Sequence, residues 1–503
     1  MSSIVYLRNS KSNTIYAYLN ESVWDPEKKK CICKRKCIGH LDPDTGKIVP
    51  NRSSKPKQTP WIKSRYVTKL FEEVSKELQL SEVLSLCFPD DWKKISTLAY
   101  YVAANNNELQ FCHHWCETHK TPDGKIMTPE KTNELLKNID SNAISLFFTL
   151  WRLRLQPDEV YVDTIIFRES SDDMTNYAKN LGIEPDDRQY KTKMELYFTT
   201  KNDIPLCYEL SSLSTGHVYG DYDVRRESFR KLTSFLDEEK GDVFDASLIA
   251  YAGSNIIVRV LPDNEFVKEL TEKVSKSIAN AENGRMVFGN FLFIETFMNH
   301  YNGKRYYTHI CYDPNRAAND LSAFLTIVNN CRYEIESGNP IPDHQHIYDK
   351  YLLTREENDC TIAEYNSQAI MQHSNNAGYS VYISNFTRNP VSALIPFLQR
   401  KMITDMFNGM MNEYDSNSIN LSTEQVYLSR IFIQFIALII KCEIERKMNV
   451  YKLNKTLSYK ELIEMLDSIR TVRMPGSKKM VDTEIDGPTL RVMNLLGIGP
   501  EED

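Results

Sequence analysis

The chain has 503 residues, and this length predicts roughly two to four domains. Hydrophobic residues make up 41% and charged residues 26% of it, with 18 Gly and 20 Pro, which excludes disordered, collagen-like and membrane-embedded proteins. Residues 1–13 hold no apolar core before a small-residue cleavage site, so we expect no secretory signal and a cytoplasmic location. The longest apolar run, residues 431–440, is too short to span a bilayer, and it predicts a buried helix and no membrane partner.

Basic and acidic residues are unevenly distributed along the chain. Residues 1–65 hold 14 Lys and Arg against 5 Asp and Glu, an excess of +9, whereas the other 47 basic and 63 acidic residues sum to −16. A basic module on an acidic body suggests contact with a polyanion, and double-stranded DNA is the default candidate. A solvated basic surface is the alternative. The candidate DNA-binding residues are Lys28, Lys29, Lys30, Lys34, Arg35 and Lys36.

The first predicted elements form a small β-rich module of residues 1–60. Residues that favour strands cluster at 4–7, 14–19 and 32–38, which predicts a β-meander. Residues 51–60 are rich in Ser, Lys and Pro and form a linker. From Tyr66 to about Arg154 apolar residues recur at helical spacing, which predicts a helical region of residues 61–155. This region is a further candidate for DNA binding.

A mixture of strands and helices follows, and it predicts an α/β core with an insertion. The first part of the core, residues 156–262, has expected strands at 160–167, 194–199, 204–209 and 255–261 and an expected helix at 224–236. The separate insertion, residues 263–375, has strand-like segments at 287–296 and 305–311 and a long helix at 315–336. The core resumes over residues 376–450, with a strand at 379–384 and helices at 389–411 and 423–448, and 451–503 form a C-terminal tail.

Two clusters of Cys and His offer zinc-type ligands. In the first cluster, lysines and an arginine lie between the ligands, and this positive charge favours a basic strand without a metal ion. In the second cluster, three ligands lie on one helix face, which favours packing in the apolar core. The eleven cysteines are irregularly spaced, and we expect reduced thiols. The two clusters are Cys31, Cys33, Cys37 and His40, and Cys112, Cys116 and His119.

Motifs for nucleotide binding and serine hydrolysis are missing from the sequence: it has no Gly-x-Gly-x-x-Gly, no Walker A loop and no Gly-x-Ser-x-Gly. The remaining candidate for a catalytic residue is Asp163, which is flanked by apolar residues in the expected strand at 160–167. A carboxylate at the centre of a buried strand is costly unless it is paired or binds a metal ion. Both a structural ion pair and a catalytic metal ligand therefore stay open for Asp163.

Several segments, taken in order, resemble insertion-sequence transposases of the DDE type, in the long-chain group with a Tyr-Arg-Glu-Lys signature. The resemblance covers nearly the whole chain, and the order of the segments makes it far more specific than any one alone. The matching segments are YLNESVWD at 18–25, KCIGHLDP at 36–43, LAYY at 98–101, YDPNRAA at 312–318 and FIALI at 435–439.

The resemblance implies an RNase H-like core interrupted by a β-containing insertion, and three acids that hold two Mg²⁺ ions. Asp163 takes the position of the first acid. Paired metal ions stabilise the attacking and leaving oxygens of a phosphoryl transfer, and they need several carboxylates to hold them. Double-stranded DNA is the implied partner, and a homodimer is an open option.

The sequence departs from the family at the other two acids. Arg400 fixes the register of the signature, in which the Tyr position falls on Phe397 and the Glu position on Thr404. The neighbouring Asp405 points about 100° away along a helix. The Asp-x-Gly-aromatic turn expected for the second acid is missing between 236 and 255, where Asp245 is the weak candidate.

Two main functions remain after these departures, and a third is distant. The favoured one is a transposase-derived DNA-binding protein without strand-transfer activity, because one metal ligand cannot support two-metal chemistry. The alternative is an active DDE transposase that cleaves and joins DNA with Mg²⁺ and displaced acids. A zinc-binding structural protein with no DNA role comes last.

Overall fold

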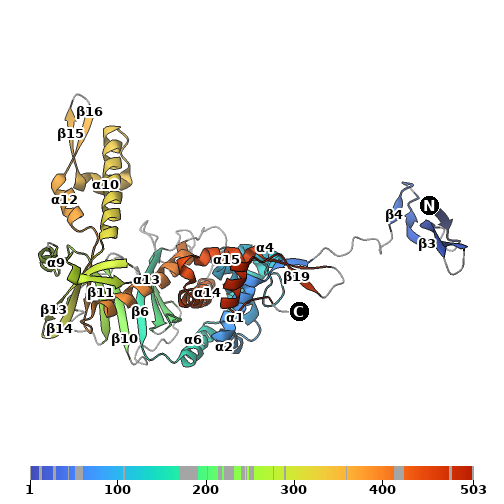
Figure 1. The fold of residues 1–503 in the computed structure, drawn as a ribbon, viewed down its shortest axis with the longest axis horizontal. Coiled ribbons are helices and arrows are strands. Elements are labelled where there is room, and N and C mark those ends of the chain that lie inside the picture. The colour runs from blue at the N-terminus through green and yellow to red at the C-terminus, as the bar shows by residue number, and fades with distance from the viewer. Residues whose placement is uncertain are drawn as a thin grey trace.

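A computed structural model of the chain describes most of its residues. They are 2–10, 14–25, 30–43, 45–50, 61–105, 108–168, 191–200, 202–212, 218–219, 231–238, 244, 246–247, 254–275, 277–287, 290–357, 360–412, 424–474 and 479–500. Figure 1 shows a small β-rich N-terminal unit, a body of one large sheet with helices, and an arm that projects from one end of that sheet. The predicted α/β class is confirmed.

The N-terminal unit is a four-stranded antiparallel sheet in the order β1-β2-β3-β4, as expected for a β-meander. Strands β3 and β4 lie so close that a Cβ on Gly39 would stand 2.2 Å from the carbonyl oxygen of Val49, so only glycine fits there. The strands are β1 (Ser2–Arg8), β2 (Ile15–Asp25), β3 (Lys30–Leu41) and β4 (Ile48–Pro50).

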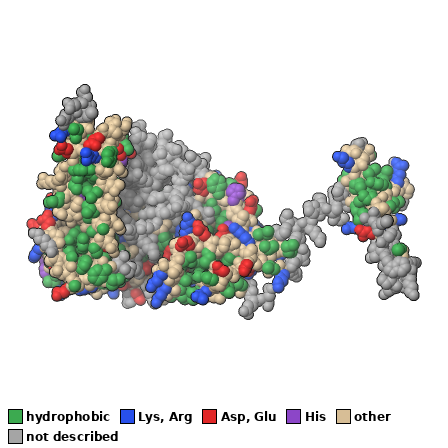
Figure 2. Space-filling model, turned by 45° about the horizontal axis from the view of Figure 1, so that its top comes forward, with side chains coloured by type: hydrophobic (Ala, Val, Ile, Leu, Met, Phe, Trp, Pro, Cys, Tyr) green, Lys and Arg blue, Asp and Glu red, His purple; other side chains and the backbone are tan. Residues whose placement is uncertain are grey.

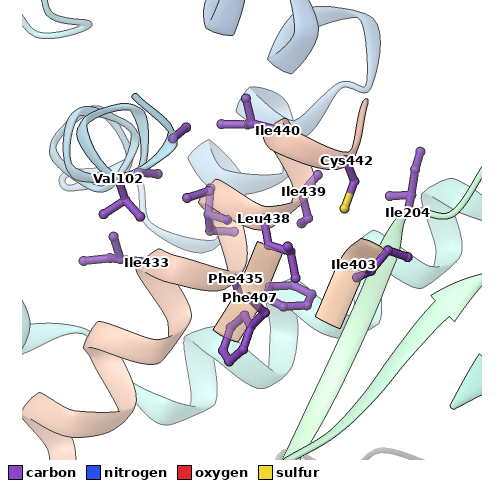
Figure 3. Close-up of a cluster of buried hydrophobic side chains, with 14 of the residues drawn as sticks. Val102, Ile204, Ile403, Phe407, Ile433, Phe435, Leu438, Ile439, Ile440 and Cys442 are labelled. Carbon is purple, nitrogen blue, oxygen red and sulfur yellow. The ribbon is translucent and has the colours of Figure 1, made fainter. Parts of the chain in front are cut away.

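The predicted helical region consists of six helices, of which α1, α3, α5 and α6 pack directly against the buried helix α14 (Glu424–Val450), and all six contribute to one apolar core with it. Residues 431–440 of α14 are at most 1% exposed, which confirms the predicted buried helix. Figure 3 shows Ile433 and Leu438 of α14 among side chains from neighbouring elements. The six helices are α1 (Tyr66–Glu77), α2 (Leu80–Cys87), α3 (Trp92–Ala103), α4 (Cys112–Thr118), α5 (Pro129–Asn138) and α6 (Ser141–Leu155).

The C-terminal segment returns to this helical region. A three-stranded sheet in the order β19-β18-β5 joins residues that precede α1 to residues near the end of the chain. None of the described helices is long and apolar enough to cross a membrane. The elements here are β5 (Trp61–Ser64), α15 (Tyr459–Ser468), β18 (Arg470–Arg473), β19 (Met480–Asp482) and α16 (Gly487–Leu495).

The large sheet has ten strands in the order β12-β13-β14-β17-β11-β10-β6-β7-β8-β9. Strands β6, β7 and β8 are successive antiparallel neighbours, and the predicted pairing of 160–167 with 194–199 is confirmed. Strand β10 runs parallel to β6, and β11 runs parallel to β10. These strands are β6 (Val160–Arg168), β7 (Lys191–Thr199), β8 (Pro205–Ser212), β9 (Val218–Tyr219), β10 (Leu232–Asp237) and β11 (Asn255–Val260).

Two expectations for this sheet differ from the structure. The helix predicted at 224–236 is wrong over Leu232 to Leu236, because these residues form strand β10 and their side chains alternate between partly and fully buried. Strands β13 and β14, which the sequence places in a separate insertion, belong to the large sheet instead, because β14 pairs with β17. The remaining strands are β12 (Gly284–Val287), β13 (Asn290–Tyr301), β14 (Lys304–Tyr312) and β17 (Tyr379–Ser384).

The arm leaves the sheet after β14 and returns at β17. Its long helix α10 begins at Pro314 behind Asp313, whose side chain accepts hydrogen bonds from the amides of Asn315 and Arg316. Gly378 closes the arm at φ +77°, where an added Cβ would lie 2.5 Å from that of Ala317. The arm comprises α10 (Pro314–Glu336), α11 (Gln345–Tyr351), β15 (Leu352–Glu357), β16 (Cys360–Tyr365) and α12 (Ser367–Asn375).

Helices cover both faces of the sheet around β11 and β17. Helix α13 (Pro390–Asn412) packs on the face that carries Phe235 and Tyr382. On the opposite face, Val267 and helix α9 (Lys268–Val274) contribute to a second apolar core. Side chains at the centre of the sheet are therefore removed from water on both sides.

Candidate functional site

The strand register places three charged side chains on one face of the large sheet. Asp163 of β6 lies opposite Phe235 of β10, so the two side chains share a face. Asp237 follows Phe235 by two residues and returns to that face. Arg259 of β11 lies opposite Asp237 and joins the same row. Two acids and an arginine thus gather under helix α13.

Helix α13 adds the fourth charge from above. The Arg400 guanidinium donates through Nη1 to Asp163 Oδ1, and through Nη2 to Asp237 Oδ2 at 3.1 Å. Arg259 Nε donates to Asp237 Oδ1 at 2.8 Å. The side chains of Arg400, Asp163 and Asp237 are at most 3% exposed, and that of Arg259 is 14% exposed. We call these four residues the Asp-Arg quartet.

The charges of the Asp-Arg quartet sum to zero within a site that excludes water. A buried ion is costly unless its charge is balanced and its polar atoms are hydrogen-bonded. Here Arg400 spans two strands with the planar fork of its guanidinium, a geometry that lysine cannot reproduce. The arrangement therefore compensates both acids with protein cations.

Aromatic rings fix the position of the Arg400 guanidinium. Its Cζ atom lies 3.7 Å from the centroid of the Phe397 ring and 5.3 Å from that of Phe235. Phe397 precedes Arg400 by about one helical turn and meets Tyr382 at a centroid distance of 4.9 Å. A cation held over a ring face in a dry site gains electrostatic energy, so the packing favours the bridging position.

Neutral polar groups extend the row beyond Arg259. Tyr382 of β17 lies opposite Arg259, and His309 of β14 lies opposite Tyr382. Burial raises the pKa of Tyr382 to about 12 and lowers the pKa of His309 to about 4. Thr296 Oγ1 lies 2.9 Å from His309 Nδ1. At neutral pH both side chains are therefore uncharged.

The structure brings together some of the predicted site residues and not others. Asp163 and Arg400 meet, although 237 positions separate them in the chain. Thr404 lies one turn after Arg400 in α13, but its side chain and that of Asp405 are outside the described atoms. Asp245 lies outside the described residues.

Asp237 is the member of the candidate site, together with Arg259, that the sequence did not identify. It ends strand β10, beside the strand of Asp163, where the second acid was expected. The residues that follow it are Glu-Glu-Lys-Gly instead of the expected x-Gly-aromatic, and the assignment of 224–236 to a helix hid the strand. The sequence holds no apolar–polar alternation that could have found this strand, because its buried positions are Thr233, Phe235 and Asp237.

The residues of the quartet do not fit a pair of magnesium ions. Mg²⁺ requires oxygen ligands in a nearly octahedral arrangement. Arg400 bonds to a carboxylate oxygen of Asp163 and to one of Asp237, and the signature position for the third acid is Thr404. Among the described side chains, the two acids of the quartet are therefore bonded to arginines and are not arranged as a ligand set for two Mg²⁺ ions.

The predicted DNA-binding residues lie in the N-terminal unit. Figure 2 shows Lys and Arg side chains along the edge of this unit, and Arg35 and Lys36 of β3 are exposed. Lys30 and Lys34 also belong to β3, but their side chains are outside the described atoms. Lys28 and Lys29 lie outside the described residues.

Among the described side chains, which leave out that of Cys33, the predicted Cys and His clusters form no compact group of three ligands. Cys112 Sγ and Cys116 Sγ lie 3.8 Å apart on α4. His119, however, points its Nε2 to Asp467 Oδ1 of α15 at 2.7 Å and stacks on Trp115. This contact supports the packing interpretation for the second cluster.

No protein-family model matches the chain, and no curated protein shows significant sequence similarity to it.

Proposed function

We propose that the chain is a transposase-derived DNA-binding protein with an RNase H-like core and without strand-transfer activity. The order β8-β7-β6-β10-β11 supports the core. Numbered along the chain with the two-residue strand β9 left out, this is third, second, first, fourth and fifth, with the first three strands antiparallel and the last two parallel to the first. The resemblance to DDE transposases implies this plan, with acids on the first and fourth strands, where Asp163 and Asp237 lie.

The bridge that Arg400 forms between Asp163 and Asp237 carries the proposal that strand transfer is absent. One guanidinium contacts both acids that would hold metal ions, and Arg259 balances the remaining charge. A metal ion would have to displace Arg400 from two hydrogen bonds and from the Phe397 ring. The sequence offers no third acid at Thr404 to favour that exchange.

DNA binding is assigned to the basic N-terminal unit, in which Arg8, Arg35, Lys36 and Lys47 are exposed. Each phosphate that a protein cation neutralises on double-stranded DNA adds about 0.9 to the slope of log K against log salt. We expect deletion of residues 1–60 to flatten this slope, and the double substitution Arg35→Gln with Lys36→Gln to reduce it by up to about 2.

A matched control removes two lysines elsewhere. Lys452→Gln with Lys455→Gln changes the net charge equally but lies after α14, so the salt slope should stay that of the unmodified protein. Equal slopes for the full-length and truncated proteins would show that the basic unit is only a solvated surface. The homodimer and the cytoplasmic location remain predictions.

The second candidate function is an active DDE transposase. The positions of Asp163 and Asp237 favour it, because the two acids lie on adjacent parallel strands and both bind the Arg400 guanidinium. A single metal ion in the place of that guanidinium could also contact both carboxylates. A plasmid-nicking assay with Mg²⁺ or Mn²⁺ separates the two functions. We expect no nicking that depends on Asp163, and none from Thr404→Glu alone, because Arg400 still bonds to both acids. Nicking that Asp163→Ala abolishes would establish the enzyme.

A further inference from the structure

Three side chains of different chemistry converge near the far end of helix α10, in the arm (Figure 1). Cys331 and Glu334 lie three positions apart on α10 and therefore share a helix face. His344 ends the short 3₁₀ turn Pro342–His344, which precedes α11. The Cys331 sulfur, a carboxylate oxygen of Glu334 and an imidazole nitrogen of His344 all lie within 4.8 Å of one another. No other trio of metal-ligating side chains is this compact in the part of the chain that the structure describes.

These three groups are the donors that zinc prefers. Zinc binds thiolate sulfur at about 2.3 Å and imidazole nitrogen or carboxylate oxygen at about 2.0–2.2 Å, in a tetrahedron. Ligand atoms in such a site stand roughly 3.3–3.8 Å apart, so the trio needs only small side-chain shifts. Magnesium and calcium, which require oxygen ligands, do not fit a site with a sulfur.

The burial of the three groups leaves one side open for a fourth ligand. Cys331 is fully buried, whereas the side chains of Glu334 and His344 are 20% and 36% exposed. An ion can therefore enter from solvent and keep a water molecule on that side. Among the described residues, no lysine or arginine forms an ion pair with Glu334, whose partner is His344.

A second layer of hydrogen bonds holds the carboxylate in place. Tyr348 of α11 donates its hydroxyl hydrogen to Glu334 Oε2 at 2.5 Å, and the amide of Ile341 donates to the Tyr348 oxygen at 2.9 Å. His344 Nδ1 lies 2.8 Å from the same carboxylate oxygen. The contact with His344 thus joins two of the proposed ligands, and an outer partner such as Tyr348, which orients a metal ligand, is a regular part of zinc sites.

The arm has a small apolar core of its own, which a bound metal ion would help to stabilise. Its own apolar core consists of five buried residues, and Cys331 is one of them. Modules with cores this small usually depend on a metal ion or a disulfide for stability. The core residues are Val328, Cys331, Tyr348, Tyr351 and Leu352.

We propose that Cys331, Glu334 and His344 bind one zinc ion, with water as the fourth ligand. The ion ties the last turn of α10 to α11 across the turn at 337–341. Binding converts the Cys331 thiol to a thiolate and releases its proton to solvent. This site is independent of the Asp-Arg quartet and of DNA binding.

The test titrates the full-length, chelator-treated protein with Zn²⁺ by calorimetry, and with Co²⁺ as an absorbing probe of sulfur coordination. We expect one Zn²⁺ per chain and a Co²⁺ spectrum with a sulfur charge-transfer band. Cys331→Ser and His344→Gln should each weaken Zn²⁺ binding at least about tenfold, in line with lost metal ligands. The half-exposed His344 serves as the second variant, because its replacement leaves the apolar core intact.

Two controls make the result specific. His346→Gln removes an exposed histidine two residues away and should bind Zn²⁺ as the unmodified protein does. Cys112→Ser with Cys116→Ser removes a close pair of thiols on α4, away from the proposed site, and should leave the Co²⁺ band unchanged. Unchanged Zn²⁺ affinity in Cys331→Ser and His344→Gln, or a Co²⁺ band that disappears with Cys112 and Cys116, would overturn the proposal.

Discussion

Removal of the Arg400 side chain tests the Asp-Arg quartet most fully. Arg400→Met keeps the length and apolar stem of the side chain but leaves Asp163 and Asp237 with Arg259 alone, so the net charge of the quartet changes from zero to −1. Breaking a buried ion pair by removing one partner costs about 3–5 kcal/mol. Because Arg400 joins two acids at most 3% exposed, we expect the free energy of unfolding to fall by this amount.

A compensating variant separates charge imbalance from loss of packing. Asp163→Asn with Arg400→Met restores a net charge of zero, because the pair of Asp237 with Arg259 remains. We expect it to recover at least half of the stability that Arg400→Met loses. Arg355→Met, which removes an exposed arginine of β15 paired with the exposed Glu364 of β16, should cost less than about 1 kcal/mol.

Urea denaturation followed by circular dichroism measures the stability of all three variants at neutral pH. Equal slopes of the free energy of unfolding against urea concentration show that each variant exposes the same surface on unfolding. The reasoning would be refuted if Arg400→Met lowered the free energy of unfolding by less than about 1 kcal/mol, a value typical of exposed pairs. It would also be refuted if the compensating variant were no more stable than Arg400→Met.

Three further predictions concern single residues. Burial lowers the pKa of His309 from 6.5 to about 4, so stability should fall by about 3 kcal/mol as pH drops through this window, and urea midpoints of His309→Gln should show a weaker fall. Burial raises the pKa of Asp203 from 3.8 to about 6, so the protein loses stability as the pH rises through that range. The free energy of unfolding of Asp203→Asn should therefore exceed that of the unmodified protein by about 1–2 kcal/mol at pH 7, after allowance for partial exposure, and by almost nothing near pH 4. Equal effects at both pH values would contradict this. Gly378→Ala forces a Cβ to 2.5 Å from that of Ala317 at φ +77°, so it should cost about 1–3 kcal/mol, whereas Gly338→Ala, with open space around it, should cost only its backbone strain.

The sequence predicts local elements well where one periodicity dominates. Strand β17 was predicted with its observed bounds, and α10 and α14 begin and end within two residues of the predicted limits. Strand β10 was missed because its six residues, LTSFLD, do not alternate between apolar and polar, and two of its three buried positions are the polar Thr233 and Asp237. Such a segment is recognised as a strand only once its neighbours in the sheet are known.

The site was only half predictable for a related reason. Asp163 stands out because a carboxylate in an apolar strand needs a partner, and the register of the signature points to Arg400. That the two side chains meet depends on how α13 crosses the sheet, and no local pattern encodes this long-range contact. Asp237 and Arg259 join the row through strand pairing alone. Their roles therefore follow from the order of the strands and not from a motif.

The central claim is that Arg400, and not a metal ion, compensates Asp163 and Asp237. Titration of the full-length protein with Mn²⁺, with unbound Mn²⁺ followed by electron paramagnetic resonance, tests it directly when compared with Asp163→Asn and Arg400→Met. We predict that the unmodified protein has no Mn²⁺ site that depends on Asp163, and that Arg400→Met has a new one. At a Mn²⁺ concentration of ten times the Kd of that site, binding would stabilise the folded state of Arg400→Met by about 1.4 kcal/mol. A Mn²⁺ site in the unmodified protein that disappears in Asp163→Asn would contradict the claim.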